Sequence, residues 1–255
     1  MKQSFQFYAT CSPDLAKEQV LKDLLKAGMT GICLNLTGDP SLNADLAELI
    51  FRSSRSMRIV PEFLVRITRV PGEESSIDRL ISGLEPLLPF GPTGILLSGV
   101  EDQKTLIRWN KLLLARNLSQ IRLAAGISSL KGIDSLMHLL PWCRQVVLER
   151  NLLADNAPAA SLPVLQKKAA AVCNAGRTGL TVCDAFLPSL LGGSEAIPAE
   201  INDAAAAVFD GSAGIMLSET DAEAGCLISV MELLDRIVYE AMRYRDTGTG
   251  LPFSL

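Results

Sequence analysis

Short apolar runs alternate with longer stretches of helical periodicity along the whole chain. The runs are rich in Val, Ile and Leu, which is typical of parallel strands that are buried on both faces. One of them is weakened as a strand by Pro61, because proline cannot donate a ladder hydrogen bond. The eight predicted strands are Phe5–Cys11, Thr30–Leu36, Arg58–Val65, Gly94–Ser98, Ile121–Ala125, Arg144–Glu149, Gly179–Cys183 and Ala213–Ser218.

Each run is followed by a stretch whose apolar residues recur at helical spacing. The predicted helices are Leu15–Ala27, Leu42–Ser54, Ser76–Leu88, Asp102–Arg116, Ile133–Leu140, Leu162–Asn174, Pro198–Phe209 and Ala222–Arg245. Eight consecutive strand–helix units predict an α/β protein, a single (β/α)8 TIM barrel. We expect the barrel to span residues 1–245 and residues 246–255 to form a C-terminal tail.

An open, doubly wound sheet is the alternative fold. Such a sheet would be expected to carry a glycine-rich phosphate loop after an early strand. The first strand–helix turn reads CSPDL (Cys11–Leu15) and contains no glycine. The barrel is therefore the favoured prediction, and its chemistry is expected at the carboxyl ends of the strands.

Composition narrows the functional class. The chain has 255 residues, about the size of one TIM barrel, and 48% of them are hydrophobic, enough for a large core. The net charge is −4 and the sequence contains no basic stripe, so nucleic-acid binding is not expected. The N-terminus is too polar for a signal peptide, and no apolar run approaches the roughly 18 residues of a membrane span. We expect a cytoplasmic protein without membrane contact.

The six cysteines contain no C-x-x-C pair, which favours reduced thiols in a cytosolic protein. Cys11, Cys33 and Cys183 each end a predicted strand, so they are expected at the same end of the barrel. They could form a thiolate group for a soft metal or for redox chemistry, or they could fill space as small apolar residues. The only histidine, His138, lies in a helical stretch, which argues against a dedicated zinc site.

Two stretches carry a family signature. The first is LLKAGMTGICLNLTG (Leu24–Gly38), and the second runs from LPVLQKKAAAVCNAGRTGLTVCDAFLPSLL (Leu162–Leu191) into AEINDAAAAVFDGSAGIMLSET (Ala199–Thr220). Both resemble the barrel domain of pyruvate kinase, whose late motif reads A-E-x-x-D-V-A-N-A-V-x-D-G-x-D-x-x-M-L-S-G-E-T-A. The likeness extends along the chain in barrel order and is weakest around the third strand. The resemblance implies a (β/α)8 barrel.

The resemblance also implies that the catalytic positions have changed. The family's fifth strand ends K-I-E-N, whose lysine stabilises the transferred phosphoryl group and whose glutamate binds the divalent metal. The second metal carboxylate lies in A-R-G-D-L-G, an arginine in R-L-N-F-S-H-G grips phosphate, and a threonine in A-T-Q lies near the reacting carbon. In the same order, these five positions are Gly126, Ser128, Leu152, Cys33 and Cys183 in this chain.

Several polar residues remain at or beside matched positions. Asn35 and Thr37 stand where the family has two potassium ligands, although a hydrogen-bonded strand end would explain them as well. Further candidates for ligand binding are Glu149, Arg150, Asp184 and Ser218. Ser218 begins the run S-E-T, which matches the family's S-G-E-T loop except that the glycine is absent.

Two family domains are also expected to be missing from this chain. Only about ten residues, Thr68–Ile77, stand where the family inserts a lid domain, and the chain ends at Leu255 before the family's C-terminal domain. Our leading interpretation is an inactive barrel, a pseudoenzyme with a binding or regulatory role. The alternatives are a repurposed enzyme acting on a small oxo-acid or phosphorylated metabolite, and a weak pyruvate kinase.

These interpretations differ in the ligands and partners they imply. No cofactor is expected, and Mg²⁺ and K⁺ would be needed only if phosphotransfer persists. A small oxo-acid or a phosphorylated ligand is a candidate for the strand ends. Self-association or a protein partner is also expected, because the family associates partly through barrel surfaces.

Overall fold

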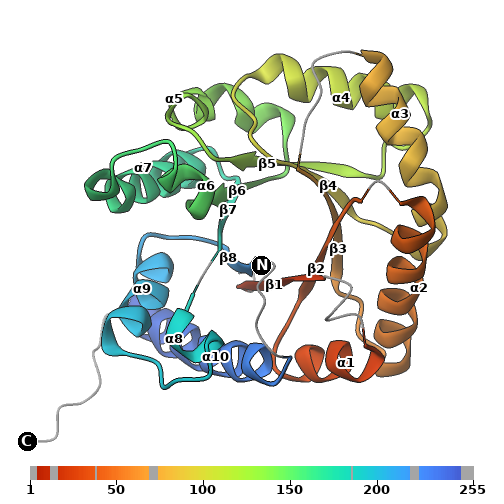
Figure 1. Ribbon diagram of the computed structural model, residues 1–255. Helices are drawn as coiled ribbons and strands as arrows, with labels where there is room; N and C mark the ends of the chain where they lie inside the picture. Colours follow the sequence, from red (N-terminus) through yellow and green to blue (C-terminus); the bar gives the residue numbers. More distant parts are fainter. Residues whose placement is uncertain are drawn as a thin grey trace, which may run out of the picture.

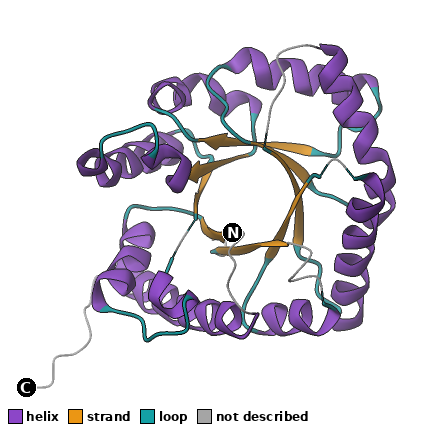
Figure 2. Ribbon diagram, in the orientation of Figure 1, coloured by secondary structure: helices purple, strands orange, loops and turns teal. Residues whose placement is uncertain are grey.

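A computed structural model describes residues 5–11, 17–37, 39–68, 74–184, 186–218 and 224–247. Its eight parallel strands close into a barrel in the order β1 to β8, which confirms the predicted TIM barrel. Figure 1 shows the strands around the centre and the helices as an outer ring, and Figure 2 separates the two layers by colour. The strands are β1 (Gln6–Cys11), β2 (Gly31–Asn35), β3 (Glu62–Ile67), β4 (Gly94–Leu97), β5 (Arg122–Ile127), β6 (Gln145–Glu149), β7 (Gly179–Cys183) and β8 (Gly214–Leu217).

The outer ring contains every helix that the periodicity predicts, together with two short ones that it does not. The helices are α1 (Glu18–Lys26), α2 (Pro40–Met57), α3 (Glu74–Leu84), α4 (Gln103–Ala115), α5 (Leu130–Leu139), α6 (Arg150–Ala154), α7 (Leu162–Ala175), α8 (Pro188–Leu191), α9 (Pro198–Phe209) and α10 (Ala224–Thr247). The unpredicted α6 and α8 follow β6 and β7. A helix of one turn is too short to show a hydrophobic period.

The third strand was predicted too early in the chain. Arg58 adopts a left-handed conformation with φ 55° and ends α2, and the N–H of Ile59 donates to the Ser54 carbonyl oxygen. The chain therefore turns before Pro61, and β3 begins at Glu62. The helix predicted over Ser76–Leu88 is also divided. It ends at Leu84 and continues as the 3-10 helix η1 (Glu85–Phe90), which contains two prolines.

The core has two layers. Inside the barrel, each strand contributes one residue to a buried cluster, namely Tyr8, Cys33, Leu64, Leu96, Ala124, Val147, Cys183 and Met216. A much larger cluster fills the space between strands and helices, and Cys11 belongs to it. Side chains alternate between these two layers along each strand. Burial of both faces explains why the strands read as continuous apolar runs.

Polar side chains close the amino-terminal end of the barrel interior. The Tyr8 hydroxyl donates to a Glu62 carboxylate oxygen at 2.6 Å and accepts from the Gln145 amide at 3.2 Å. The same amide donates to the Thr181 hydroxyl oxygen at 2.5 Å. Burial, and then the Glu62 carboxylate, raise the pKa of Tyr8, so this hydroxyl stays protonated as a donor.

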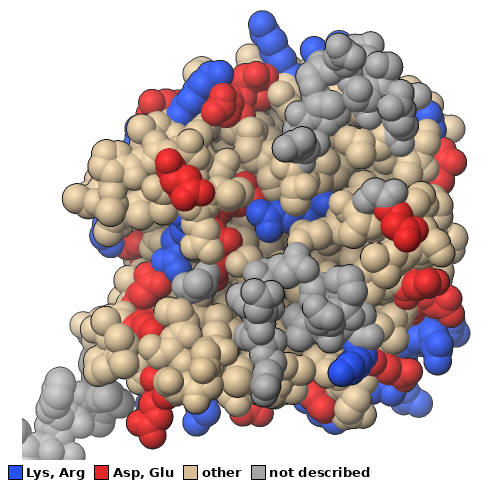
Figure 3. All heavy atoms as spheres, in the orientation of Figure 1, with Lys and Arg blue, Asp and Glu red and all other residues tan. Residues whose placement is uncertain are grey.

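The outer surface carries both signs of charge. In Figure 3, Lys and Arg side chains are interspersed with Asp and Glu around the edge of the molecule. Surface ion pairs such as Lys22–Glu18 and Lys168–Asp134, both at 2.7 Å, follow this pattern. Among the helices described here, none is both long and apolar enough to cross a membrane.

Candidate functional site

A buried ion pair occupies the carboxyl end of the barrel interior. Arg66 near the end of β3 donates from Nη2 to Oε1 of Glu149, the last residue of β6. Arg66 is 8% exposed and Glu149 is fully buried. Two such charges out of water are tolerated only when they are paired and hydrogen-bonded. The two opposite charges therefore cancel each other at the carboxyl end of the barrel, where the sequence predicts a functional site.

Ser98, directly after β4, connects the two charges. Its hydroxyl accepts from Nε of Arg66 at 3.0 Å and donates to Oε1 of Glu149 at 2.7 Å. The N–H of Gly99 donates to the second carboxylate oxygen at 3.3 Å. Burial alone would lower the pKa of Arg66, but the Glu149 carboxylate, together with the neighbouring Cys183 and Cys33, outweighs it, so the pKa is raised. The guanidinium and the carboxylate are thus both satisfied without a ligand.

Gly126 on β5 lies directly against this carboxylate. A Cβ atom at position 126 would be 2.9 Å from Oε2 of Glu149, and it would be equally close to the Leu97 carbonyl oxygen and the Ser98 Cα. Real Cβ atoms essentially never approach other atoms so closely. The position that aligns with the family's lysine therefore has room only for hydrogen.

The two positions aligned with metal carboxylates do not provide a metal site. Ser128 lies half-buried just beyond β5, and Leu152 lies on α6 with 43% of its surface exposed. Neither side chain carries a carboxylate, and the nearby Glu149 is engaged by Arg66 and Ser98. Within the described ranges, no three His, Cys, Asp or Glu residues are grouped so that they could hold a metal ion. The residues present do not fit the Mg²⁺ ion that the family resemblance implies.

Arg150, the first residue of α6, is held by neighbours on α9 and in the loop after β7. Its Nη1 donates to both Asp203 carboxylate oxygens, at 2.8 and 2.9 Å. Its guanidinium carbon lies 4.2 Å from the centre of the Phe186 ring, a cation–π geometry. The arginine therefore fastens α6 to the neighbouring β7–α9 unit.

Asp184, directly after β7, is buried in an unusual backbone conformation with φ 102°. Its Oδ2 accepts from the N–H of Asn151 at 2.6 Å, which fixes the first turn of α6. A non-glycine residue in this region is strained, typically by about 1–3 kcal/mol, and such strain often marks functional sites. Here the strained residue forms a contact that holds the neighbouring short helix.

The three cysteines that the sequence placed at strand ends do not share one environment, and Cys33 is the middle residue of β2. Cys11 packs in the outer layer, whereas Cys33 and Cys183 are fully buried inside the barrel. Burial raises the pKa of Cys33 to about 12 and that of Cys183 well above its ordinary value. The expectation that all three point to one site is therefore wrong in its geometry. The protonated, buried thiols fit the space-filling alternative.

The residues at the ends of β2 and β8 lie at the edge of this region. The Thr37 hydroxyl donates to the Asn43 amide oxygen at 2.8 Å, and the Asn43 amide donates back to the Thr37 carbonyl oxygen at 3.0 Å. These bonds favour a hydrogen-bonded loop over a potassium ligand at Thr37, while Asn35 remains half-buried at the strand end. Ser218 is half-buried after β8, and the two residues that follow it lie outside the described ranges.

Sequence analysis missed the two residues at the centre of the site, Arg66 and Ser98. The available signal was a single arginine inside an apolar strand, in the run FLVRI (Phe63–Ile67). A charge at an inward-facing strand position requires a partner in a closed barrel. The sequence does not identify that partner, because Glu149 is 83 residues away.

Comparison with known proteins identifies the family. A family model described as pyruvate kinase, barrel domain, matches residues 95–226, just over half of the chain. Pyruvate kinase from Bacillus licheniformis is 25% identical over 84% of this chain and 36% of its own length. Pyruvate kinase from Clostridium perfringens is 25% identical over 71% of the chain and 37% of its own, and pyruvate kinase 2 from a Synechocystis strain is 31% identical over 53% and 23%.

The chain thus spans little more than a third of the length of the first two relatives. The match covers the units from β4 into α10, including Gly126, Ser128, Glu149 and Leu152. The closed eight-stranded barrel agrees with it. This protein belongs to the pyruvate kinase family, through that family's barrel domain.

Proposed function

We propose that this protein is a non-catalytic member of the pyruvate kinase family, a barrel with a binding or regulatory role in place of phosphotransfer. The observation that carries the proposal is the Arg66–Glu149 ion pair. The two charges cancel each other at the carboxyl end of the barrel, and Glu149 lies against the one position, Gly126, where the resemblance would require a catalytic lysine.

The expected loss in the rate of phosphoryl transfer is large enough to support this proposal. Phosphoryl transfer depends almost entirely on positioning and charge stabilisation, so it needs a metal and cationic groups at defined places. Removal of one electrostatic donor typically costs about 10²–10³ in rate. The aligned lysine, phosphate-binding arginine and two metal carboxylates are all replaced, by Gly126, Cys33, Ser128 and Leu152.

The same contacts disfavour a repurposed enzyme at this end of the barrel. Glu149 and Arg150 are both held in ion pairs, and the pKa of the Cys183 thiol is raised by burial. None of these groups is poised as a base or a nucleophile. A small oxo-acid or phosphorylated ligand that bound to Arg66 or Glu149 would have to compete with the contact between them.

We also propose, from the sequence, a cytoplasmic location and association with a second copy or with another protein. The six cysteines are all free thiols, which fits a reducing compartment. Exposed apolar side chains on the helices, including Val164, Phe209 and Tyr239, supply contact area for such a partner.

Two measurements on the purified chain test the proposal. The first is transfer of phosphate from phosphoenolpyruvate to ADP with Mg²⁺ and K⁺, where we expect no rate above background. The second is thermal unfolding with phosphoenolpyruvate or oxalate, with and without Mg²⁺. A bound ligand at 100 times its Kd adds about 2.7 kcal/mol, or about 5–10 °C for a domain of this size. Turnover, or a shift of that size that requires Mg²⁺, would overturn the proposal.

A further inference from the structure

A polar cavity of about 530 Å³ lies at the opposite end of the barrel, beside the amino-terminal ends of β5, β6 and β7. Three arginines line it, Arg122, Arg144 and Arg177, together with Ser119, Thr178 and Trp142. Among the residues that the structure describes, no Asp or Glu lines this cavity. Such a concentration of positive charge is unexpected in a chain whose net charge is −4.

Strand register explains why these three arginines line the same cavity although they are far apart in the sequence. Arg122 begins β5, and the N–H of Arg144 donates to the carbonyl oxygen of the next β5 residue, Leu123, at 2.8 Å. Gln145 pairs with Gly179, so Arg144 lies beside Thr178, and Arg177 directly precedes Thr178. The three arginines therefore stand at the amino-terminal ends of three neighbouring strands, and all three line this one cavity.

These arginines differ from others in the protein in having no acidic partner. Arg66, Arg116 and Arg150 each pair with a carboxylate. For Arg122, Arg144 and Arg177, the described parts of the chain provide neither a salt bridge nor a side-chain hydrogen bond. Neighbouring like charges without a counter-charge attract anions, and guanidinium groups match phosphate geometry especially well.

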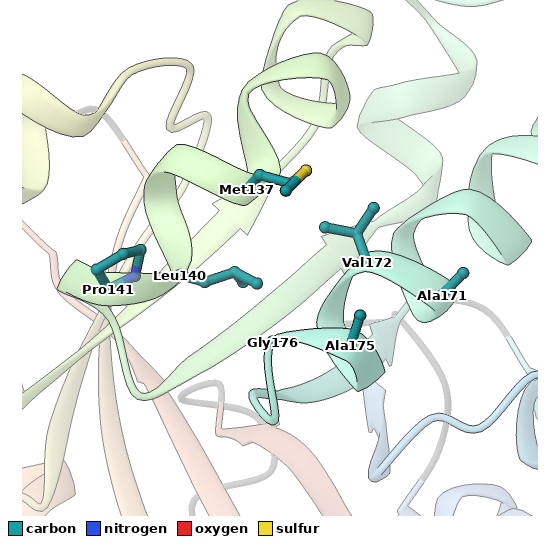
Figure 4. Close-up of a pocket in the computed structure, with 7 residues that line it drawn as sticks. All are labelled: Met137, Leu140, Pro141, Ala171, Val172, Ala175 and Gly176. Atoms are coloured by element: carbon teal, nitrogen blue, oxygen red, sulfur yellow. The ribbon is translucent and has the colours of Figure 1, made fainter.

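An apolar groove of about 550 Å³ adjoins the cavity. It lies between α5 and α7, and Figure 4 shows its apolar side chains, among them Met137 and Val172. Pro141 lines both hollows, and Gly176 of the groove directly precedes Arg177 of the cavity. The Asn110 amide donates to the Trp142 carbonyl oxygen at 3.0 Å and fixes the chain between the two hollows.

We propose that this combined surface binds a small molecule with a phosphate head group and an apolar substituent. The arginines of the cavity would hold the phosphate oxygens, and the groove between α5 and α7 would take the apolar part. The site is independent of the carboxyl end of the barrel, so it does not depend on whether phosphotransfer persists.

The backbone supplies a mild variant and a matched control. Arg177 has φ 55°, a left-handed conformation in which glycine is less strained, so Arg177→Gly removes the charge without a backbone penalty. Arg58 has the same φ of 55° and is also exposed, but it ends α2 and lines a different cavity. Arg58→Gly is therefore a control for the loss of one positive charge.

The test uses the intact chain with inorganic pyrophosphate as the head-group probe, measured by calorimetry at low salt. Wild type and Arg58→Gly should bind it equally. Arg144→Gln and Arg177→Gly should each weaken binding by about tenfold, the effect of one charge-assisted hydrogen bond. Absence of binding to the wild type would overturn the proposal. So would an equal loss in Arg58→Gly, or undiminished binding in both cavity variants.

A second probe examines the apolar half of the site. Octyl phosphate should bind more tightly than inorganic phosphate, and Met137→Gln should reduce that advantage while leaving pyrophosphate binding unchanged. Met137 is 72% exposed, so this substitution should not disturb folding. Trp142 is 39% exposed while Trp109 is buried, so a change in the fluorescence of the exposed tryptophan should accompany binding. Equal affinity for the two phosphates would overturn the apolar half of the proposal.

Discussion

The α-carbon of Gly126 lies so close to the Glu149 carboxylate that a single added methyl group would stand 2.9 Å from Oε2. Two of the three nearest atoms belong to the backbone of Leu97 and Ser98, which cannot move as a side-chain end can. We expect Gly126→Ala to lower the free energy of unfolding by about 1–3 kcal/mol, the usual cost of overpacking. Urea unfolding measures this change.

Gly83 on α3 provides the control for this substitution. A Cβ atom there would meet nothing within 4 Å. Gly83→Ala should therefore be neutral or stabilising by up to about 1 kcal/mol, since alanine favours a helix. Equal stability of the two alanine variants would mean that Gly126 is not packed as described.

Replacing one partner of the Arg66–Glu149 ion pair should lower the free energy of unfolding more than replacing both partners together. Arg66→Met leaves the fully buried Glu149 carboxylate without its counter-charge. Glu149→Gln likewise leaves the Arg66 guanidinium without its counter-charge. Each single change should destabilise the protein by about 3–5 kcal/mol. The double variant should be more stable than the sum of both losses implies, because no uncompensated charge remains. A double-mutant cycle in urea measures this coupling, and additive losses would show that the two charges are independent.

Buried thiols should make the protein less stable in alkaline solution. The pKa values of Cys33, Cys143 and Cys173 are raised by burial to about 12, against 9.0 for a free thiol. Between these values the unfolded chain loses protons that the native protein keeps. The contribution of these thiols to the free energy of unfolding is therefore fully present below pH 9. It decreases as the pH rises toward 12, by up to about 1.4 kcal/mol per pH unit for each thiol.

Urea unfolding between pH 8 and pH 10.5 measures this slope, with Cys33→Ala as the comparison. The variant should lose less stability per pH unit than the wild type, because one of the shifted thiols is absent. Identical slopes would mean that Cys33 ionises in the native protein as it does in the unfolded chain.

The hydrogen bonds of Tyr8 at the amino-terminal end of the barrel predict a fourth effect on stability. Tyr8→Phe removes the hydroxyl that donates to Glu62 and accepts from Gln145. The ring can still pack, so the expected loss is that of the hydrogen bonds, about 1–3 kcal/mol. Thermal unfolding measures it. A Thr30→Val variant, which loses a hydroxyl that bonds to the Phe7 backbone nearby, gives a comparison for a bond without a charged partner.

The fold was predictable because burial on both faces leaves a simple pattern in the sequence. All eight strands appear as apolar runs, and seven of them lie within two residues of their predicted bounds at each end. The third run was misplaced because Arg58 and Pro61 interrupt it, and only the structure shows that the turn falls between them. The short helices α6 and α8 carry no periodicity.

The site was only partly predictable, for a different reason. The replaced positions, such as Gly126 and Leu152, could be located by resemblance, because the strands keep their order. The partner of Arg66 could not, since it comes from β6, three strands further along the closed barrel. Nor does the sequence show that Arg150 pairs with Asp203, a contact that depends on where α9 packs.

The Arg66–Glu149 contact also has a consequence for how the chain can be divided. A TIM barrel can be regarded as two halves of four strands each, and this pair joins β3 of the first half to β6 of the second. Ser98 belongs to the first half and bonds to both charges. A fragment ending after β4 would keep the guanidinium without its carboxylate, and the complementary fragment would keep the carboxylate without its guanidinium. Each half therefore gains stabilising contacts from the other, and we expect the barrel to unfold as one cooperative unit.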